Sequence, residues 1–347
     1  MKWDAVAPRA AAWRQRGGYF SWRPEKPDAS AVDVFHIEIG DPGLPVLVLV
    51  HGFPTSSVDW FDIAARLSAS FRVCALDFPG YGFSGKPPGW GYSIPRDAEL
   101  LEFYLSEVLN ARSAIVLAHD RGASVALVHA AGCADGSCRV GLEHLVLTNA
   151  NIFLPLANLR ESQRLMLHEP AASQPFGQMT PDALAQLLGA TAFTPARSSA
   201  DQEIEAIASA LAHDNGMAVL PETVQYLAER AAGEQSWLEA LAASATPTTL
   251  IWGMSDTVAP PRVATFVWDR YLMLKPGRNS LYLVPDANHY IQNDRPDALA
   301  DIVLRALDPA AATTPGAITA APGSPLLIDC SRRALPAAAE VLTTPQA

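Results

Sequence analysis

Residues 113–130, SAIVLAHDRGASVALVHA, decide the fold class of this chain. Their first half is a nearly unbroken apolar run, typical of a strand buried on both faces of a sheet, and a helical pattern follows directly. Small residues, Ala118 and Gly122, stand two positions on either side of Asp120. A sharp strand–turn–helix elbow needs small residues there, because bulk would clash. The pattern therefore predicts an elbow with Asp120 at its tip, where the helix dipole stabilises a carboxylate.

The same aspartate also fits an ordinary helix N-cap, a position where Asp is common. Other parts of the chain decide between these two interpretations. An acid, Asp256, follows an apolar run at Thr248–Trp252, and a histidine, His289, follows the last run at Leu281–Val284. Nucleophile, acid and histidine then occur in the chain order of the hydrolases that use such an elbow. We therefore predict a catalytic triad of Asp120, Asp256 and His289.

A second turn is expected to face the elbow. The apolar run Val48–Val50 leads into His51–Pro54, so that the backbone N–H of Phe53 can point toward the predicted nucleophile. The N–H of Arg121, directly after the nucleophile, is a second donor. Because two N–H groups aimed at one oxygen form an oxyanion hole, we assign that role to Phe53 and Arg121.

Apolar runs recur along the chain and alternate with amphipathic stretches. This alternation predicts an α/β fold with a mostly parallel, doubly wound sheet. The first run alternates with His36 and Glu38, which suits an edge strand. The seven runs are Val34–Ile39, Pro45–Val50, Arg72–Leu76, Ser113–Leu117, Leu142–Leu147, Thr248–Trp252 and Leu281–Val284.

The alternation divides the chain into four segments. Residues 1–151 and 246–307 carry the strand-like runs and form the predicted core. Residues 152–245 have no convincing strand run, and helix starts such as TPD at 180–182 predict an inserted helical cap. Residues 308–347, rich in Ala, Pro and Thr, predict a flexible tail.

With these motifs the chain resembles the α/β-hydrolase superfamily, in the branch of the epoxide hydrolases and haloalkane dehalogenases. The motifs that carry the resemblance are HGFPTSSVDW (51–60), ALDFPGYGFSGKP (75–87), LAHDRGA (117–123), IWGMSD (251–256) and ANHYIQNDRPDAL (287–299). It is similar in particular to the mesoderm-specific-transcript-like proteins of that branch. That likeness rests on WRQRGGYF (13–20), HGFPTSS (51–57), LTNANIF (147–153), HDNG (213–216) and QYLAER (225–230). The resemblance implies the α/β-hydrolase fold with an inserted helical cap.

An aspartate nucleophile implies a particular reaction. A carboxylate that attacks a saturated carbon displaces a leaving group and forms an alkyl ester on Asp120. Water that His289 deprotonates then hydrolyses this ester at its carbonyl, while Asp256 stabilises the imidazolium. We therefore expect a hydrolase whose leaving group is an epoxide oxygen or a halide.

The residues expected around the leaving group differ between relatives in the branch. Haloalkane dehalogenases carry a tryptophan directly after the nucleophile, and often an asparagine or a second tryptophan as halide partner, where this chain has Arg121 and Phe53. Fluoroacetate dehalogenases share HDRG, but their second arginine stands at the position of Ser124. Epoxide hydrolases protonate the leaving oxygen with cap tyrosines, usually two, and the predicted cap contains one, Tyr226. We expect an epoxide hydrolase-like enzyme with Tyr226 as the acid, and a haloalkane or haloacid dehalogenase as the alternative.

Tyr226 also has a simpler interpretation. In PETVQYLAER (221–230) the apolar residues form one helical stripe, from which Tyr226 points away, as a solvent-facing tyrosine would. Further residues expected to line the substrate pocket are His51, Pro54, His119, Asn151 and Trp237.

Two other classes of protein share the fold. A conventional esterase would need a serine at the elbow tip. A non-catalytic binding protein that retains the fold would need neither Asp256 nor His289, and the complete predicted triad therefore argues against it.

Composition limits the partners of this chain of 347 residues. Its formal net charge of −11 disfavours nucleic acid and anionic membranes, where a basic face would be expected. No apolar run reaches the roughly 18 to 20 residues of a membrane span. We expect a cytoplasmic enzyme that acts on a small molecule without a cofactor or a metal, and its oligomeric state stays open.

The cysteines do not suggest a disulfide framework. Cys74, Cys133, Cys138 and Cys330 are too few and too scattered for one. Cys133 and Cys138 flank a short polar turn, a spacing that suits a local disulfide or half of a metal site. We expect the simplest state, a reduced pair in a loop.

Overall fold

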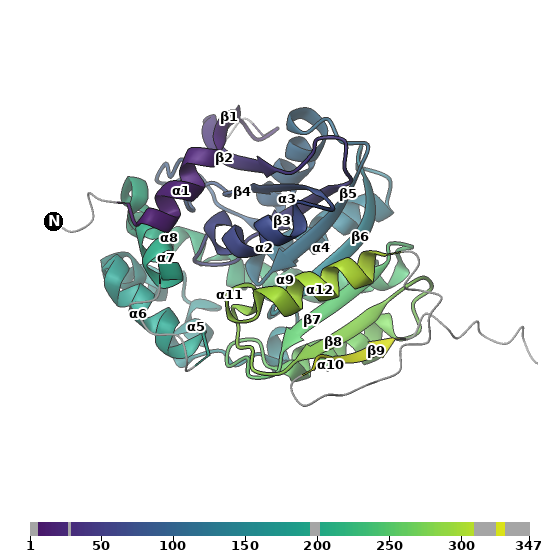
Figure 1. Cartoon of the computed structure of the whole chain (residues 1–347). Coiled ribbons are helices and arrows are strands. Elements are labelled where there is room, and N and C mark those ends of the chain that lie inside the picture. Colours follow the sequence, from purple (N-terminus) through teal and green to yellow (C-terminus); the bar gives the residue numbers. More distant parts are fainter. Residues whose placement is uncertain (1–5, 27–28, 195–201, 309–323, 330–347) are drawn as a thin grey trace, which may run out of the picture.

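The computed structural model describes residues 6–26, 29–194, 202–308 and 324–329. Within these residues a single nine-stranded sheet, in the order β1-β2-β4-β3-β5-β6-β7-β8-β9, has helices on both faces (Figure 1). The strands are β1 (Gly18–Trp22), β2 (Val32–Ile39), β3 (Val46–Val50), β4 (Arg72–Leu76), β5 (Ser113–His119), β6 (Gly141–Thr148), β7 (Thr248–Gly253), β8 (Ser280–Val284) and β9 (Leu326–Asp329). All pairs from β4 to β8 are parallel, which confirms the predicted mostly parallel, doubly wound sheet.

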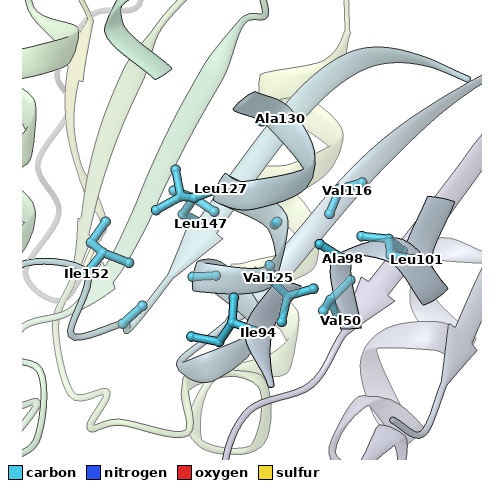
Figure 2. Packing of buried hydrophobic residues seen from close by; sticks show 14 of the residues in the cluster. Val50, Ile94, Ala98, Leu101, Val116, Val125, Leu127, Ala130, Leu147 and Ile152 are labelled. Atoms are coloured by element: carbon cyan, nitrogen blue, oxygen red, sulfur yellow. The ribbon is translucent and has the colours of Figure 1, made fainter. Parts of the chain in front are cut away.

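Helices cover both faces because successive side chains of the central strands point to opposite sides. The helices concerned are α2 (Phe61–Leu67), α3 (Ile94–Phe103), α4 (Arg121–Ala134), α10 (Pro261–Val267) and α12 (Pro296–Leu307). Leu49 of β3 packs in a cluster with α2 and α12, whereas its neighbour Val48 packs in a cluster with α3, α4 and α10. Figure 2 shows this second cluster, in which Val116 and Leu147 of the sheet lie near Val125 of α4.

Two strands lie outside the predicted runs. β1 pairs antiparallel with β2 in the register Tyr19↔Phe35, so the expectation that Val34–Ile39 is an edge strand is wrong. β9 pairs antiparallel with β8, so Leu326–Asp329, in the segment expected to be flexible, belong to the sheet. Both strands are short segments whose pairing depends on a neighbouring strand rather than on a long apolar run.

Between β6 and β7 the described residues contain helices and no strand. These are η4 (Leu154–Leu156), α5 (Glu161–Met166), η5 (Pro170–Gln178), α6 (Pro181–Thr191), α7 (Gln202–Ala212), η6 (His213–Asn215), α8 (Gly216–Thr223) and α9 (Tyr226–Ala243). We call this segment the cap. Its last helix, α9, packs on α4 of the core. The division into domains stays a prediction. Within the described ranges, every helix falls short of the length and apolarity that crossing a membrane demands.

The structure joins Cys133 and Cys138 in a disulfide, so the expectation of a reduced pair is wrong for this state. Cys133 lies in the last turn of α4. A turn with Gly136 at φ +86° then reverses the chain and brings the two Cα atoms to 4.6 Å. Cys74 is a buried free thiol, and Cys330 lies outside the described residues.

Candidate active site

Asp120 lies at the junction of β5 and α4, in the strand–turn–helix elbow that the sequence predicts. Its backbone has φ 45° and ψ −115°, a combination that residues other than glycine rarely adopt. Gly122 shows why the elbow needs small residues. A Cβ atom there would lie 2.5 Å from the carbonyl oxygen of His51 and 2.6 Å from that of Val50. The α4 helix can therefore approach β3 closely only because Gly122 has no side chain.

The structure brings the three predicted triad residues together. Nδ1 of His289 lies 3.0 Å from Oδ2 of Asp256, and Nε2 on the other side of the ring lies 3.9 Å from Oδ1 of Asp120. Asp256 is held by the backbone N–H groups of Val258 and Ala259, which donate to its Oδ1 at 2.7 and 2.8 Å. All three side chains are buried. The arrangement suits a nucleophile, a base and an acid that orients the base.

The two carboxylate oxygens of Asp120 have different surroundings. Oδ2 accepts a hydrogen bond from the backbone N–H of Phe53 at 3.0 Å, whereas Oδ1 faces His289. Phe53 is therefore placed as one donor of the predicted oxyanion hole. Arg121 provides the first N–H of α4, and first-turn N–H groups have no partner within the helix. Its side chain turns away into the core, where Nη2 lies 2.5 Å from Oδ2 of Asp97.

Neighbouring charges set the protonation states of this pair. Burial alone would raise the pKa of Asp120, but the charges of Arg230 and His289 lower it below its ordinary value. Burial alone would lower the pKa of His289, but the carboxylates of Asp256 and Asp120 raise it above its ordinary value. Asp120 is therefore ionised at neutral pH, as its predicted role as a nucleophile requires, and His289 readily holds a proton next to it.

Arg230 is a site residue that the sequence analysis missed. It extends from α9 into the core, fully buried, where Nε donates to Oγ of Ser124 at 2.8 Å and Nη2 donates to the backbone oxygen of Asp120 at 3.1 Å. Its Nη1 lies 3.9 Å from Oδ1 of Asp120. A guanidinium from the cap thus lies beside Ser124, the position at which fluoroacetate dehalogenases carry their second arginine. The sequence offered one indication of this role: Arg230 stands four residues after Tyr226, so both side chains lie on the same face of one helix.

Tyr226 is buried, so its interpretation as a solvent-facing residue is wrong. Only 5% of the residue is exposed, and it lines the cavity above Asp120. Its ring lies 5.4 Å from that of Phe53, and the guanidinium of Arg230 lies 4.9 Å from its centroid. The buried stripe of α9 includes Arg230 and Glu234 as well as apolar residues, which a purely apolar pattern could not reveal. Burial and the charge of Asp120 raise the pKa of Tyr226, so its hydroxyl keeps its proton at neutral pH.

A cavity of about 820 Å³ opens between the core and the cap, with Asp120 and His289 in its wall. Its remaining wall is mostly apolar, and its volume is in the range of small-molecule sites. Of the residues predicted to line the pocket, Pro54 and Asn151 do so. The side-chain oxygen of Asn151 is buried and makes no hydrogen bond within the described part of the chain.

Three residues predicted for the pocket lie elsewhere. Trp237 packs against the backbone of Gly233 on α9, where a Cβ would come within 2.2 Å of its ring. His51 accepts a hydrogen bond from the N–H of Phe78 at 3.1 Å, and Nε2 of His119 lies 2.9 Å from the backbone oxygen of His289. Burial lowers the pKa of His51 to about 3 and that of His119 to about 4, so both rings are neutral. These two histidines support the turns that carry the site instead of contacting a substrate.

Two further residues near the triad were not predicted. Asn149, at φ 42° after β6, donates through Nδ2 to Oδ2 of Asp256 at 2.8 Å and to the backbone oxygen of Asn288 at 3.1 Å. It therefore links the acid to the turn that carries the histidine. Tyr290 lines the cavity next to His289, and its ring stacks on Phe193 at 4.8 Å. Asn149 follows the end of β6, and Tyr290 follows His289. Neither an asparagine nor a tyrosine at such a position indicates by itself that the residue belongs to the site.

Comparison with known proteins agrees with this fold. The model of the alpha/beta hydrolase family matches residues 47–302. The chain belongs to this family and is a hydrolase of the α/β-hydrolase fold.

Its relatives include mesoderm-specific transcript proteins and a haloalkane dehalogenase, two of the groups that the sequence motifs suggested. It is 29% identical over 302 residues to the hydrolase LipZ of Mycobacterium tuberculosis, covering 87% of this chain and 99% of LipZ. It is 30% identical over 262 residues to the mesoderm-specific transcript homolog protein of Homo sapiens, covering 74% and 76% of the two chains. It is also 28% identical over 288 residues to haloalkane dehalogenase 2 of Mycobacterium tuberculosis, covering 80% and 92%. The predicted resemblance is thereby confirmed.

Proposed function

We propose that this hydrolase works through a covalent alkyl ester on Asp120, with His289 as the base and Asp256 as its partner. One observation carries the proposal. The residue at the elbow tip is a carboxylate whose Oδ2 accepts from the N–H of Phe53 at 3.0 Å, while its Oδ1 stays on the side of His289. A conventional esterase needs a hydroxyl at this position, because its nucleophile must attack a carbonyl carbon.

The proposed reaction has two half-reactions. In the first, Oδ1 of Asp120 forms a bond to a saturated carbon of the substrate, and the leaving group departs with the electron pair of the broken bond. In the second, His289 takes a proton from water, and the hydroxide attacks the carbonyl carbon of the ester. The oxyanion that forms is Oδ2, which already lies at the N–H of Phe53. Collapse releases the product alcohol with the oxygen of Asp120 that formed the ester, and the imidazolium protonates it. The proton left on the Asp120 carboxyl returns to the group that protonated the leaving oxygen, or passes to water when a halide left.

An epoxide is the substrate class that Tyr226 supports. An epoxide oxygen leaves as an alkoxide, which needs a proton as the carbon–oxygen bond breaks. The tyrosine lines the cavity together with Asp120, and its raised pKa keeps the hydroxyl protonated until the more basic alkoxide forms. We therefore assign Tyr226 as the acid of an epoxide hydrolase-like reaction on a small molecule. A cytoplasmic location stays a prediction.

Dehalogenation is the second candidate, supported by two observations. One relative is haloalkane dehalogenase 2, and the guanidinium of Arg230 lies beside the nucleophile. The position after the nucleophile, however, holds Arg121, whose side chain pairs with Asp97 and is turned away from Asp120. The residues that usually bind a halide in this branch are therefore not in place, and we rank this candidate below epoxide opening.

Adduct trapping tests the proposal and separates the two candidates. A His289→Gln variant, incubated with a panel of epoxides, haloalkanes and haloacids, should form the ester but hydrolyse it slowly. An epoxide adds its whole mass to the peptide that contains Asp120, whereas a halide adds the alkyl group without the halogen. The matched control is His144→Gln, a buried histidine that bonds to Thr249 at 2.9 Å, away from the triad. If no adduct forms with any substrate that the unaltered enzyme consumes, the covalent mechanism is wrong.

A further inference from the structure

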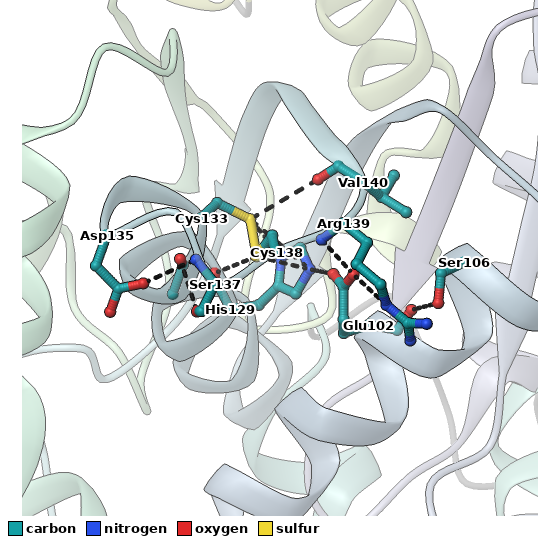
Figure 3. The surroundings of a disulfide bond; sticks show 10 residues. Glu102, Ser106, His129, Cys133, Asp135, Ser137, Cys138, Arg139 and Val140 are labelled. Atoms are coloured by element: carbon teal, nitrogen blue, oxygen red, sulfur yellow. Dashed lines mark hydrogen bonds and ion pairs between the residues drawn. A yellow bond between two sulfur atoms is a disulfide. The ribbon is translucent and has the colours of Figure 1, made fainter.

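A cluster of potential metal ligands lies at the end of α4 that is remote from the nucleophile (Figure 3). Nε2 of His129 lies 3.9 Å from Sγ of Cys133 and 3.8 Å from Sγ of Cys138. From α3, Oε2 of Glu102 lies 2.9 Å from the same nitrogen. The histidine is buried, whereas both cysteines are half-buried and can be reached from solvent. The proposed hydrolysis uses none of these groups.

The cluster has nearly the dimensions of a tetrahedral zinc site. With Zn–S bonds of about 2.3 Å and Zn–N bonds of about 2.0–2.1 Å, a tetrahedron places each sulfur about 3.6 Å from the nitrogen and the sulfurs about 3.8 Å apart. The sulfur–nitrogen distances in the structure, 3.8 and 3.9 Å, are already close to these values. Oε2 of Glu102, at 2.9 Å from the nitrogen, would have to move out to about 3.4 Å, and the two sulfur atoms are too close together because they are bonded to each other. Reduction of this bond lets them separate.

We propose that the reduced Cys133–Cys138 pair, with His129 and Glu102, binds one Zn²⁺ ion, and that the disulfide is the closed, metal-free form of the same site. A dithiol reductant supplies two electrons and two protons, and is itself oxidised to a disulfide while the two cysteines become thiols. Zinc then displaces the two thiol protons and bonds to both thiolates, the neutral imidazole and the carboxylate. This inference departs from the expectation, drawn from the sequence, that the chain holds no metal.

Neighbouring residues favour this donor set over a plain disulfide. His129 stands four residues before Cys133 on one helix face, so both side chains point to the same place. Two thiolates and a carboxylate around Zn²⁺ leave one net negative charge. Arg139 offsets part of that charge: its backbone N–H donates to Oε1 of Glu102 at 2.8 Å and its Nε lies 3.8 Å from the same oxygen, while its Nη1 pairs with Glu107. A disulfide alone requires neither the buried imidazole nor this carboxylate.

Metal titration of the reduced protein tests the proposal. The full chain is reduced with dithiothreitol, freed of reductant without oxygen, and titrated with Zn²⁺ or with Co²⁺ as a spectroscopic probe. We expect one ion per chain, a thiolate-to-cobalt charge-transfer band, and no binding after reoxidation. Cys133→Ser, Cys138→Ser or His129→Gln should each weaken binding at least about a hundredfold, and Glu102→Gln at least about tenfold. The matched control, Cys74→Ser, removes the buried free thiol of β4 and should leave binding unchanged.

Three outcomes would overturn the zinc site. The pair does not reduce while the protein stays folded, the reduced protein shows no thiolate–cobalt band, or the variants bind as tightly as the parent. In the last case the ion lies elsewhere, and loss of binding in Asp120→Asn would place it in the active site. If a cysteine variant does not fold, Zn²⁺ binding can still be compared between the reduced and the reoxidised parent protein. These two forms have the same sequence and differ only in the disulfide, so the comparison shows whether binding requires the reduced pair.

Discussion

Nη1 of Arg230, on the cap helix α9, lies 3.9 Å from Oδ1 of Asp120 at the start of α4. Both side chains are almost completely buried, with 1% and 5% of their surface exposed. A charge acts strongly on its neighbour when little water screens it. Against the effect of burial, Arg230 lowers the pKa of Asp120. The cap therefore supplies one of the charges that keep the proposed nucleophile of the core ionised.

Arg230→Met should raise the pKa of Asp120. Alkylation requires the carboxylate, so its rate falls as the pH drops through that pKa, and the variant should lose activity at a higher pH than the parent. Arg230→Lys keeps the positive charge and should shift the profile less. The measurement is the rate of ester formation in single turnovers as a function of pH. If the rate of ester formation falls at the same acidic pH in the parent and in both variants, Arg230 does not set the pKa of the proposed nucleophile.

Neutralising Asp120 should lower the pKa of His289. The carboxylates of Asp256 and Asp120 raise this pKa against the effect of burial, so Asp120→Asn removes one of the two stabilising charges. Ester formation removes the same charge, because an alkyl ester is neutral. His289 therefore loses its proton at a lower pH in the intermediate than in the free enzyme, when it must act as a base. NMR titration of the imidazole in the parent and in Asp120→Asn checks this, and an unchanged pKa would contradict it.

Tyr226→Phe should slow alkylation by an epoxide at least about a hundredfold, the lower part of the range for general acid catalysis. Halide departure needs no proton, so any dehalogenation should change little. Tyr290→Phe serves as the comparison, because Tyr290 also lines the cavity but its hydroxyl is buried, and we expect a smaller effect. Rapid-quench measurement of the ester with matched epoxide and halide substrates gives both rates. Equal losses in the two tyrosine variants would remove the assignment of Tyr226 as the acid.

Gly122→Ala should destabilise the fold by about 1–3 kcal/mol, as overpacking a tight contact typically does. Its Cβ would lie 2.5 Å from the backbone oxygen of His51, and backbone cannot move aside as a flexible side chain can. Gly141→Ala is the matched control, because a Cβ there meets nothing closer than 3.6 Å. Thermal and chemical unfolding of both variants gives the comparison. Equal stabilities would show that the elbow tolerates a side chain.

The sequence predicted the parallel sheet and the triad for one physical reason. Strands buried on both faces appear in the sequence as apolar runs. Asp120 follows its run directly, and Asp256 and His289 lie within about five residues of the ends of theirs. Gly122 indicated the elbow, because the sharp turn leaves no room for a side chain at that position. Local patterns of this kind need no knowledge of distant contacts.

The remaining site residues depend on contacts between distant parts of the chain. Arg230 and Tyr226 come close to Asp120 only because α9 packs on α4, a contact that no local pattern encodes. Asn149 is an ordinary turn residue until β6 and β7 pair and bring it to Asp256. The pairing of Cys133 with Cys138 likewise follows from the turn geometry after α4.

The most direct test of the covalent mechanism is a single turnover in water labelled with oxygen-18, with enzyme in excess over the substrate that trapping identifies. In the proposed mechanism the oxygen newly bonded to carbon comes from Asp120, and the water oxygen replaces it in the carboxylate. The product of the first turnover should therefore be unlabelled at that carbon, and the peptide containing Asp120 should gain one labelled oxygen. Asp120→Asn, with reversion to Asp excluded by mass, should form no ester and no product. Label in the first-turnover product, with none in the peptide, would mean that water attacks the substrate directly and would contradict the account.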